Sequence, residues 1–432
     1  MKTENSNFSG IDIPSDDVLT NCMHCGLCLP VCPTYAITGR EKSSPRGRIR
    51  LIKSVAEGTL DITQGFVDEM NFCLDCQACE TACPAGVKYG SLVESARNQI
   101  RVQRKDSEFT LMMKWIFLRN ILSKKYLLNI VSKLLGIYQS SGLEAAFKNS
   151  LVVKKLTPKL FKLQLLSPRI DGRFFDEIYP EIVLPRNTPK YTVGFLSGCI
   201  MNVAFAHVHE DTIKVLLHHD CRVIIPKKQV CCGSLQAHNG DFDVARELAK
   251  KNIDAFLKHD LDAIVMDSAG CGALMKEYGH YLHGDPEYSE KAKQLSGKVK
   301  DLTEFLYEIG LKVPAKQFSH RVSYHDACHL IHAQKISKEP RDLIKSIPGI
   351  DFVELNEASW CCGSAGIYNV THYEDSMKIL DRKMNNVKET QAEYLVANNP
   401  GCLTQIEYGC SQQQVNMKIV HFSTLLRTVY EL

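Results

Sequence analysis

The sequence predicts an α+β protein in which a helical domain precedes a duplicated α/β domain with parallel sheets. Three observations indicate this architecture. Two runs of four closely spaced cysteines lie within the first 90 residues. From about residue 190 onward, short apolar segments typical of strands alternate with segments of helical periodicity. The order of these segments, and of the cysteines between them, occurs twice before the chain ends.

These changes in pattern divide the chain into four parts. Residues 1–106 form the helical cysteine-containing domain, and residues 107–189 form a basic amphipathic helical segment and linker. Residues 190–315 are the first α/β repeat, and residues 316–432 are the second. A chain of 432 residues is long enough for several domains with substantial cores.

Both N-terminal cysteine runs have the spacing C-x2-C-x2-C-x3-C-P, which binds 4Fe-4S clusters in bacterial-type two-cluster ferredoxins. Three neighbouring thiolates of a run bind one cluster, and the fourth binds the other. We therefore predict two 4Fe-4S clusters with interleaved ligands. The ligands of cluster one are Cys22, Cys25, Cys28 and Cys83, and those of cluster two are Cys73, Cys76, Cys79 and Cys32. Zinc also binds C-x2-C pairs, but a zinc site needs four ligands and not two interleaved runs that each end in proline.

Three arginines lie between the cysteine runs. Ser44-Pro45 predicts a turn, and residues 49–56 have helical spacing that ends near Gly58. This stretch either simply connects the two runs, or its arginines have an electrostatic role. In that second interpretation, one of the three offsets the negative charge of the clusters or docks an acidic partner. The arginines are Arg46, Arg48 and Arg50.

The eighteen cysteines of so long a chain do not suggest a small secreted disulfide scaffold. Residues 1–17 are polar and lack the apolar core of a signal peptide, so we expect a cytoplasmic protein whose thiols serve metals. No run of eighteen uncharged apolar residues occurs, which argues against a membrane span. Any membrane contact is therefore expected to be peripheral, at the cytoplasmic face, or through a partner. We expect no nucleic-acid partner.

Positive charge is concentrated in one segment of the chain. Residues 111–170 contain eleven Lys or Arg and one acid, Glu144, although the whole chain has a net charge of only +3. Apolar residues recur between the lysines at helical spacing. Three interpretations stay open: the apolar stripe packs on the ferredoxin-like domain, docks a partner, or lies on an anionic membrane surface. Prolines from Pro158 to Pro189 indicate a linker.

The two α/β repeats have the same order of predicted elements. Ligands of such parallel sheets bind at the carboxyl ends of the strands. In the first repeat we predict strands at 191–197, 222–225 and 263–267, and helices at 205–218, 241–259 and 271–282. In the second repeat we predict strands at 321–325, 351–355 and 393–397, a helical stretch ending near Ile347, and a helix at 371–388.

A second set of cysteines occupies matching positions in the two repeats. Each repeat has one cysteine after its first strand, an adjacent pair in a Cys-Cys-Gly motif, and one after its third strand. These residues are Cys199, Cys231, Cys232 and Cys271, followed by Cys328, Cys361, Cys362 and Cys402, with offsets of 129, 130, 130 and 131 residues. We predict that the cysteines of each repeat gather in a pocket and bind metal, as a further iron–sulfur cluster or zinc. Reduced or redox-active thiols are the alternative.

Cys221 and Cys410 have no counterpart in this pattern and are interpreted as buried structural thiols. Several histidines lie near the cysteines. We interpret them as structural residues held by hydrogen bonds, because this role is commoner than metal ligation. They are His207, His209, His325 and His329.

These motifs together resemble the glycolate oxidase iron–sulfur subunit family, whose relatives include iron–sulfur subunits of lactate-oxidising and anaerobic glycerol-3-phosphate dehydrogenase complexes. The segments of this chain that match the family are both ferredoxin-type cysteine runs, Ser44 to Arg48, Gly86 to Gly90, and both Cys-Cys-Gly repeats. The repeats also resemble those of heterodisulfide reductase subunits, which carry noncubane clusters. Those repeats end in C-x-x-C, whereas Ser268 and Asn399 occupy the first of these positions here. This departure argues against a noncubane cluster and a disulfide-reducing activity.

The resemblance implies an electron-transfer subunit of a flavin-dependent 2-hydroxy-acid dehydrogenase complex of the glycolate or lactate type. No G-x-G-x-x-G fingerprint, P-loop or haem motif is found. Since iron–sulfur clusters pass single electrons, an FAD-containing partner subunit is expected to oxidise the substrate. Electrons then pass toward a quinone or another acceptor. One alternative is a heterodisulfide-reductase-like subunit that reduces a disulfide or quinone within the repeats. Another is a scaffold whose repeats bind zinc or no metal.

Overall fold

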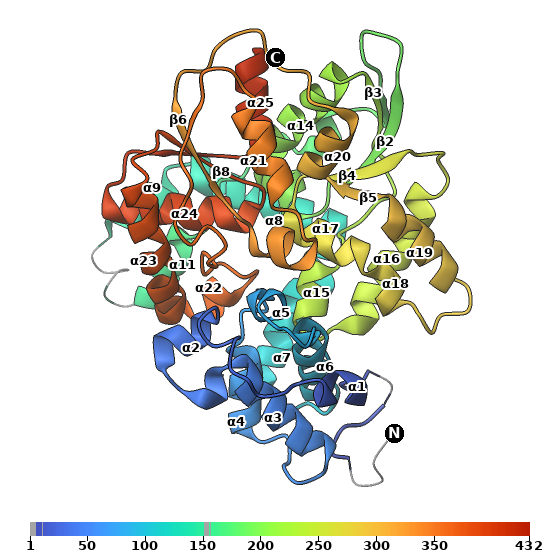
Figure 1. The fold of residues 1–432 in the computed structure, drawn as a ribbon, viewed down its shortest axis with the longest axis vertical. Coiled ribbons are helices and arrows are strands. Elements are labelled where there is room, and N and C mark those ends of the chain that lie inside the picture. The colour runs from blue at the N-terminus through green and yellow to red at the C-terminus, as the bar shows by residue number, and fades with distance from the viewer. Residues whose placement is uncertain (1–5, 11, 151–154, 156) are drawn as a thin grey trace.

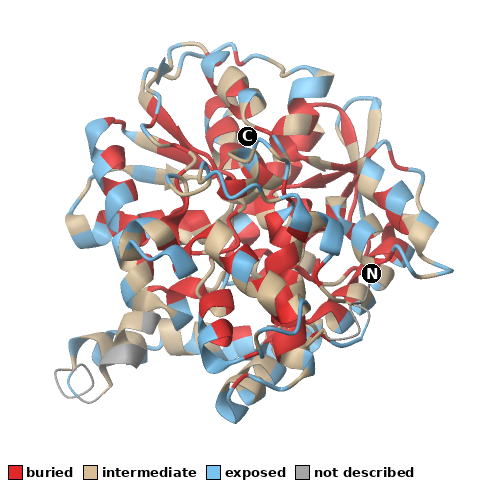
Figure 2. Ribbon diagram, turned by 60° about the horizontal axis from the view of Figure 1, so that its bottom comes forward, coloured by how far each residue is buried: buried red, intermediate tan, exposed pale blue. Residues whose placement is uncertain are grey.

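The computed structural model describes residues 6–10, 12–150, 155 and 157–432. A helical N-terminal domain lies against a larger C-terminal part that contains two sheets (Figure 1). Buried residues concentrate along the strands and on the inward faces of the helices, as Figure 2 shows. The predicted fold class is confirmed.

The N-terminal domain is built from short helices around the cysteine loops. Ser44 caps helix α3, because its side chain accepts a hydrogen bond from the Gly47 N–H (3.0 Å), and Pro45 occupies the first turn. Buried Ile52, Met70 and Leu92 hold α3, α4 and α6 together. The elements are α1 (Asp16–Thr20), α2 (Pro33–Thr38), the 3-10 helix η1 (Glu41–Ser43), α3 (Pro45–Ala56), α4 (Gln64–Asn71), α5 (Ala78–Thr81) and α6 (Tyr89–Val102).

The basic segment is helical, as predicted, and two of its buried apolar residues pack within the C-terminal part. Leu128 and Leu166 join a core cluster formed mainly by the first helices of repeat one and by repeat two. The elements are α7 (Glu108–Lys114), the π-helix η2 (Trp115–Ile121), α8 (Lys125–Ser140), α9 (Leu143–Asn149), α11 (Pro158–Leu165) and α12 (Phe175–Ile178). Residues 151–154 and 156 of the predicted basic segment lie outside the described residues.

Several positive charges of this segment are paired with acids from other parts of the chain. Arg119 Nε contacts Asp241 Oδ2 (2.6 Å), Lys125 Nζ contacts Asp176 Oδ2 (2.9 Å), and Lys162 Nζ contacts Glu374 Oε1 (2.5 Å). The concentration of charge in the sequence is therefore partly neutralised by folding. No helix in the described ranges is long and apolar enough to cross a membrane.

The first repeat forms a five-stranded sheet of order β1-β3-β2-β4-β5, in which all pairs are parallel except β1 with β3. Its strands are β1 (Ile182–Val183), β2 (Tyr191–Phe195), β3 (Cys221–Ile224), β4 (Ala263–Met266) and β5 (Val299–Asp301). Its helices are α13 (Ile200–Ala204), α14 (Ala206–His218), α15 (Ser234–His238), α16 (Phe242–Phe256), α17 (Ala269–Lys276), α18 (Tyr278–Tyr281), α19 (Ser289–Lys298) and α20 (Leu302–Ile309).

The second repeat forms a four-stranded parallel sheet of order β7-β6-β8-β9. Its strands are β6 (Arg321–His325), β7 (Asp351–Phe352), β8 (Tyr394–Ala397) and β9 (Lys418–Val420). Its helices are the π-helix η3 (His329–Ala333), α21 (Lys338–Lys345), α22 (Tyr368–Thr371), α23 (Tyr373–Glu389), α24 (Pro400–Gln413) and α25 (Phe422–Tyr430). Without β1, the first sheet has the same strand order as the second.

The structure differs from the predicted elements in three respects. The predicted helix 271–282 is two helices, α17 and α18, and α17 starts at Ala269, so that Cys271 lies in its first turn. Strand β1 lies within the predicted linker and pairs antiparallel with β3 at the edge of the sheet. The edge strands β5 and β9 are three residues each, too short to show a strand periodicity in the sequence.

Candidate metal centres

The predicted ligands of cluster one line a common cavity of about 30 Å³. Cys22, Cys25, Cys28 and Cys83 surround it, together with Cys79 of the second run. Cys25 is exposed and the other three predicted ligands are partly buried. This set of sulfur atoms therefore lies close to the surface of the domain.

The two cysteine loops have the same backbone conformation at matching positions. His24 (φ 53°) and Gly26 (φ 88°) of the first loop, and Asp75 (φ 55°) and Gln77 (φ 60°) of the second, are left-handed at matching positions. Alternation of this kind turns backbone N–H groups toward a common centre, as in many iron–sulfur sites. In the second loop, the Asp75 N–H donates to Cys73 Sγ (3.3 Å).

The predicted ligands of cluster two are buried more deeply. Cys32, Cys76 and Cys79 are buried, and Cys73 is partly buried. Burial raises the pKa of the Cys79 thiol well above its usual range, and the neighbouring charges of Cys76, Cys73 and Cys32 raise it further. A bound metal supplies the positive charge that keeps such thiols deprotonated.

A buried cation, Arg48, accompanies this second set. Burial opposes its charge, but the nearby Tyr89, Cys73, Cys32 and Glu69 outweigh burial and raise the pKa of its guanidinium. Arg48 Nε donates to the Glu69 carbonyl (2.7 Å), whereas Nη2 is buried without a hydrogen-bond partner in the described chain. Eight thiols and this cation suit a pair of anionic 4Fe-4S clusters. Arg46, in contrast, is partly exposed and pairs with Glu41 (2.6 Å).

We expect the Arg48→Met substitution to lower the reduction potential of cluster two, because a buried positive charge favours the reduced, more negative cluster. A loss of ~1.4 kcal/mol of this stabilisation corresponds to ~59 mV for a one-electron couple. Redox titration followed by electron paramagnetic resonance measures the shift. Arg50→Met, at an exposed position, is the control. An unchanged potential in Arg48→Met would show that Arg48 has only a structural role.

In each repeat the four cysteines form a continuous series of contacts. Cys231 Sγ lies 3.4 Å from Cys199 Sγ, and Cys232 interacts with both Cys231 and Cys271. Cys362 Sγ lies 3.5 Å from Cys402 Sγ, and Cys361 interacts with both Cys328 and Cys362. The predicted gathering of four thiols therefore takes the same form in both copies.

Both series line one cavity of about 1290 Å³, together with Cys73 of the ferredoxin-like domain. The cavity lies beyond the carboxyl ends of β2, β4, β6 and β8, where the strand order reverses and ligands of such sheets bind. The repeats meet at the first residues of α17 and α24, where the Ala269 N–H donates to the Asn398 carbonyl (3.0 Å). The eight cysteines thus surround a shared space and not two separate pockets.

The glycine of each Cys-Cys-Gly motif has a steric function. Gly233 (φ 94°) and Gly363 (φ 91°) are both left-handed. A Cβ on Gly363 would lie 2.7 Å from the Ser376 carbonyl oxygen, and a Cβ on Gly233 would lie 3.3 Å from Ala245 Cα. Only glycine combines this conformation with such close packing.

Ser268 and Asn399, which replace the first cysteine of the C-x-x-C pattern, also line the shared cavity. The side-chain Oδ1 of Asn399 accepts a hydrogen bond from the Gly270 N–H (3.3 Å), and its Nδ2 donates toward Cys402 Sγ (3.7 Å). Asn399 therefore links the repeats at a position where a fifth thiol would lie.

The cluster-two loop contacts both repeats. Leu74, Cys76 and Ala78 pack in one apolar cluster with Trp360 and Cys361 of the second repeat. Burial raises the pKa of the Cys76 thiol, and the neighbouring Cys328 is the next cause. In Figure 1, α5 lies at the boundary between the two parts, and it contacts η3 of the second repeat. The second cysteine run is thus the part of the ferredoxin-like domain that faces the repeats.

An ionic cluster that no sequence pattern indicates joins the first repeat to the same loop. His238 Nδ1 lies 2.6 Å from Glu94 Oε1 and 3.1 Å from Asp75 Oδ2, and Tyr281 OH donates to Glu94. These residues are far apart in the sequence. Arg97 Nη1 also donates to the His238 carbonyl (2.8 Å).

The remaining predicted residues have structural environments. His209 Nδ1 pairs with Asp267 (2.7 Å) and His207 Nδ1 with Asp171 (3.2 Å), in agreement with a structural interpretation. Cys221 and Cys410 are buried, as predicted. His325 is different, because it lies beside Cys362 and Cys402.

Comparisons with known protein families agree with this architecture. Residues 18–87 match the family described as 4Fe-4S dicluster domain, and residues 193–276 and 322–407 match the family described as cysteine-rich domain. Fold and sites together define an iron–sulfur protein that combines a dicluster domain with a duplicated cysteine-rich domain.

Three curated relatives narrow this class. The chain is 40% identical over 413 residues to the probable glycolate oxidase iron-sulfur subunit of Bacillus subtilis (strain 168), covering 94% of this chain and 93% of that protein. It is 30% identical over 409 residues to the glycolate oxidase iron-sulfur subunit of Escherichia coli (strain K12), with 94% and 93% covered. The chain belongs to the family of glycolate oxidase iron-sulfur subunits, which confirms the resemblance. Lactate utilization protein A of Oceanobacillus iheyensis is 33% identical over 237 residues, covering 55% of this chain and 96% of that protein.

Proposed function

We propose that this chain is the electron-transfer subunit of a flavin-dependent 2-hydroxy-acid dehydrogenase complex of the glycolate or lactate type. One observation carries the proposal. The two sets of ferredoxin-type cysteines extend from exposed Cys25 to buried Cys76, which packs against the cysteines of the second repeat. Such a path connects the protein surface with the shared cavity.

In this proposal, two 4Fe-4S clusters are held by the ligand sets that the cysteine spacing predicts. When bound, the clusters supply one-electron transfer. The chain's own residues tune this process. Arg48 places a buried positive charge beside the second set, and Tyr89 OH approaches Cys73 Sγ (3.5 Å). Hydrogen bonds to cluster sulfurs and net charge both influence reduction potential.

Electrons enter at the Cys25 end, where an FAD-containing partner subunit docks. Two large apolar side chains flank Cys25 on the surface: Met23 is 67% exposed and Leu27 is 57% exposed. Apolar residues around a partly exposed cluster suit a protein contact that excludes water. At the partner's flavin, the hydroxy acid loses two electrons and two protons and becomes the 2-oxo acid.

Electrons leave toward the shared cavity. A quinone-type acceptor takes up two electrons and two protons there, one electron at a time. The exposed apolar residues of α7, η2 and α8 form a face suited to peripheral contact with the cytoplasmic side of a membrane. They include Trp115, Tyr126, Leu134 and Ile137, each about 60% exposed.

A second function is favoured by the convergence of eight thiols in one cavity: reduction of a disulfide or quinone within the repeats, as in heterodisulfide reductase. Ser268 and Asn399 argue against its noncubane form, because each repeat offers four cysteines. Reduction of a disulfide to two thiols by the chemically pre-reduced holoprotein, which supplies the two electrons without a flavoprotein partner, would favour this second function.

The proposed function is tested by anaerobic purification of the chain with its co-expressed flavoprotein partner. We expect the two subunits to co-purify, and iron and acid-labile sulfide analysis to give at least about eight iron atoms per chain, as two 4Fe-4S clusters require. Addition of glycolate or lactate should bleach the cluster absorbance. Clusters that stay oxidised while the flavin is reduced would contradict the proposal.

A further inference from the structure

The residue five positions after each Cys-Cys-Gly glycine lies at the boundary with the ferredoxin-like domain. In the first repeat this residue is His238, and in the second it is Tyr368, 130 residues later. His238 ends α15, and Tyr368 begins α22. The two side chains therefore occupy matching places in the duplication.

The surroundings of these two side chains differ in polarity. His238 contacts two carboxylates of the ferredoxin-like domain, so its Nδ1 is partnered. Tyr368 packs instead in the apolar cluster that contains Leu74 and Cys76 of the cluster-two loop. The Tyr368 ring also lies near the ring of Phe72, with centroids 6.2 Å apart. The second repeat thus meets the cluster-two loop through a phenol and not through an ion pair.

The Tyr368 hydroxyl is a buried donor without an acceptor. The residue is 4% exposed, and its OH has no hydrogen-bond partner in the part of the chain that the structure describes. Burial raises the pKa of this phenol, and the negative charges of Asp375 and Cys73 raise it further, so the hydroxyl keeps its proton. Buried polar groups of native proteins nearly always have a partner. The hydroxyl therefore indicates a group that binds here.

The neighbouring charges relate this hydroxyl to the second set of ferredoxin-type cysteines. The charges that act on Tyr368 include Cys73, a predicted ligand of cluster two, and Arg48, the cation that accompanies this set. Arg48 Nη2 is likewise buried without a hydrogen-bond partner among the described residues. Two unpartnered donors, one from each side of the domain boundary, therefore lie within electrostatic reach of the same thiol.

Cys73 already has donors of its own. Its Sγ accepts from the Asp75 N–H (3.3 Å) and from Tyr89 OH (3.5 Å), both within the ferredoxin-like domain. The Tyr368 hydroxyl is thus available to a different sulfur. A 4Fe-4S cluster contains inorganic sulfides besides its thiolates, and hydrogen bonds to its sulfurs influence its reduction potential. The donors present therefore fit a cluster at this position.

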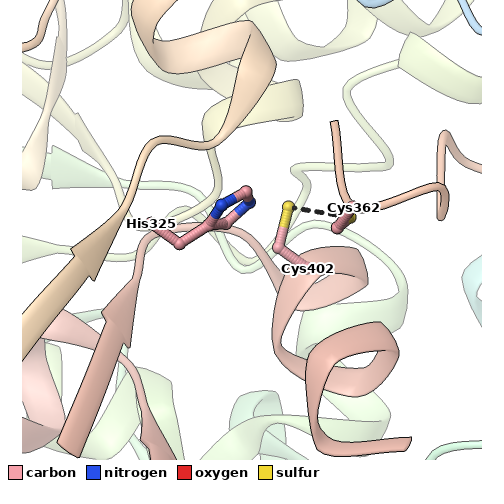
Figure 3. Close-up of side chains that lie close together, drawn as sticks. All are labelled: His325, Cys362 and Cys402. Atoms are coloured by element: carbon pink, nitrogen blue, oxygen red, sulfur yellow. Dashed lines mark hydrogen bonds between the residues drawn. The ribbon is translucent and has the colours of Figure 1, made fainter. Parts of the chain in front are cut away.

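Other buried polar side chains of the second repeat lie with its own cysteines. Figure 3 shows His325, at the end of β6, beside Cys402 and Cys362. Tyr324, one residue earlier, is fully buried, and its hydroxyl is also unpartnered within the described ranges. The leading charges that act on Tyr324 all belong to the two repeats. Tyr324 therefore provides an internal comparison for Tyr368.

We infer that the Tyr368 hydroxyl donates a hydrogen bond to a sulfur of cluster two, so that the second repeat supplies part of the environment of this cluster. The inference rests on the proposed 4Fe-4S cluster of the second ligand set. Reduction adds one electron to the cluster, so a donor to its sulfur stabilises the reduced state and raises the reduction potential. The potential of cluster two then depends on the contact between the two parts of the chain.

The test compares Tyr368→Phe with the wild type in the full chain, purified anaerobically with its metal centres. Electron–nuclear double resonance of reduced cluster two, recorded in H2O and in D2O, detects exchangeable protons bound to cluster sulfur. We expect Tyr368→Phe to lose one such proton. The equilibrium constant for reduction should fall about three- to tenfold, which is ~28–59 mV for a one-electron couple. Tyr324→Phe, which removes the other unpartnered hydroxyl, is the matched control and should change neither value.

A second substitution retains the hydroxyl. Tyr368→3-fluorotyrosine makes it a stronger donor, so the potential of cluster two should rise, opposite to the effect of Tyr368→Phe. This variant also decides the question if Tyr368→Phe fails to fold. An exchangeable proton that persists in Tyr368→Phe, with an unchanged potential, would overturn the inference and leave the proposed relay intact. Iron analysis that shows no cluster two would instead refute the proposed function, and the inference with it.

Discussion

Replacing Cys76 with serine is expected to remove one of the two proposed clusters and to reduce electron transfer from the flavoprotein to the acceptor by more than ~100-fold. Cys76 is buried between the second cysteine run and the second repeat, so no solvent thiol can replace it. Iron analysis should show a loss of about four iron atoms per chain. Reduction of the partner's flavin by the hydroxy acid should persist.

Two variants make this result specific. Cys25→Ser, at the exposed end of the path, should also interrupt transfer but should leave the spectrum of cluster two. Cys221→Ala alters a buried thiol in the first sheet and should retain both clusters and full transfer. Normal acceptor reduction by a Cys76→Ser protein that lacks cluster two would refute the relay.

Replacing His238 with glutamine is expected to destabilise the contact between the ferredoxin-like domain and the first repeat by ~3–5 kcal/mol, as for other broken buried ion pairs. His238 is 19% exposed and contacts Asp75 and Glu94, which are nearly fully buried. Without the His238 imidazolium, the buried carboxylates of Asp75 and Glu94 lose a neighbouring positive charge. Denaturant unfolding of the cluster-loaded protein measures the change, with exposed His283→Gln as the control.

The stabilisation of this contact by His238 should depend on pH. Burial opposes protonation of His238, but the hydrogen bonds to Asp75 and Glu94 outweigh burial and raise its pKa to about 10. The pKa of an unfolded histidine is ~6.5. The stabilisation is therefore complete below about pH 6.5, decreases as pH rises, and is lost above about pH 10. His238→Gln should lack this decrease, and an identical pH profile in both proteins would contradict the assignment.

The sequence alone was sufficient for the features that depend on local spacing. The two C-x2-C-x2-C-x3-C-P runs identify the ferredoxin-type loops, because the ligands of one cluster lie only a few residues apart. The offsets of 129 to 131 residues between the Cys-Cys-Gly copies predicted the duplication, and the strand orders of the two sheets agree with it. Short edge strands such as β5 and β9 escaped prediction, since three residues carry too little periodicity.

Contacts between distant segments could not be predicted in this way. Sequence periodicity marked residues 111–170 as a basic amphipathic segment, but Asp241, Asp176 and Glu374 neutralise part of its charge from elsewhere in the chain. The approach of His238 to Asp75 likewise spans 163 residues. No local pattern records such pairs, because they depend on how the domains pack.

The residues of ligand type and their grouping along the chain can be identified without coordinates, because the spacing of thiolates is a property of one loop. Three features depend on the packing of the domains: the eight repeat cysteines share one cavity, Cys76 faces the second repeat, and His325 lies beside Cys362 and Cys402. The meeting of two repeats depends on the packing of α17 against α24 and on the close contact of the ferredoxin-like domain with both.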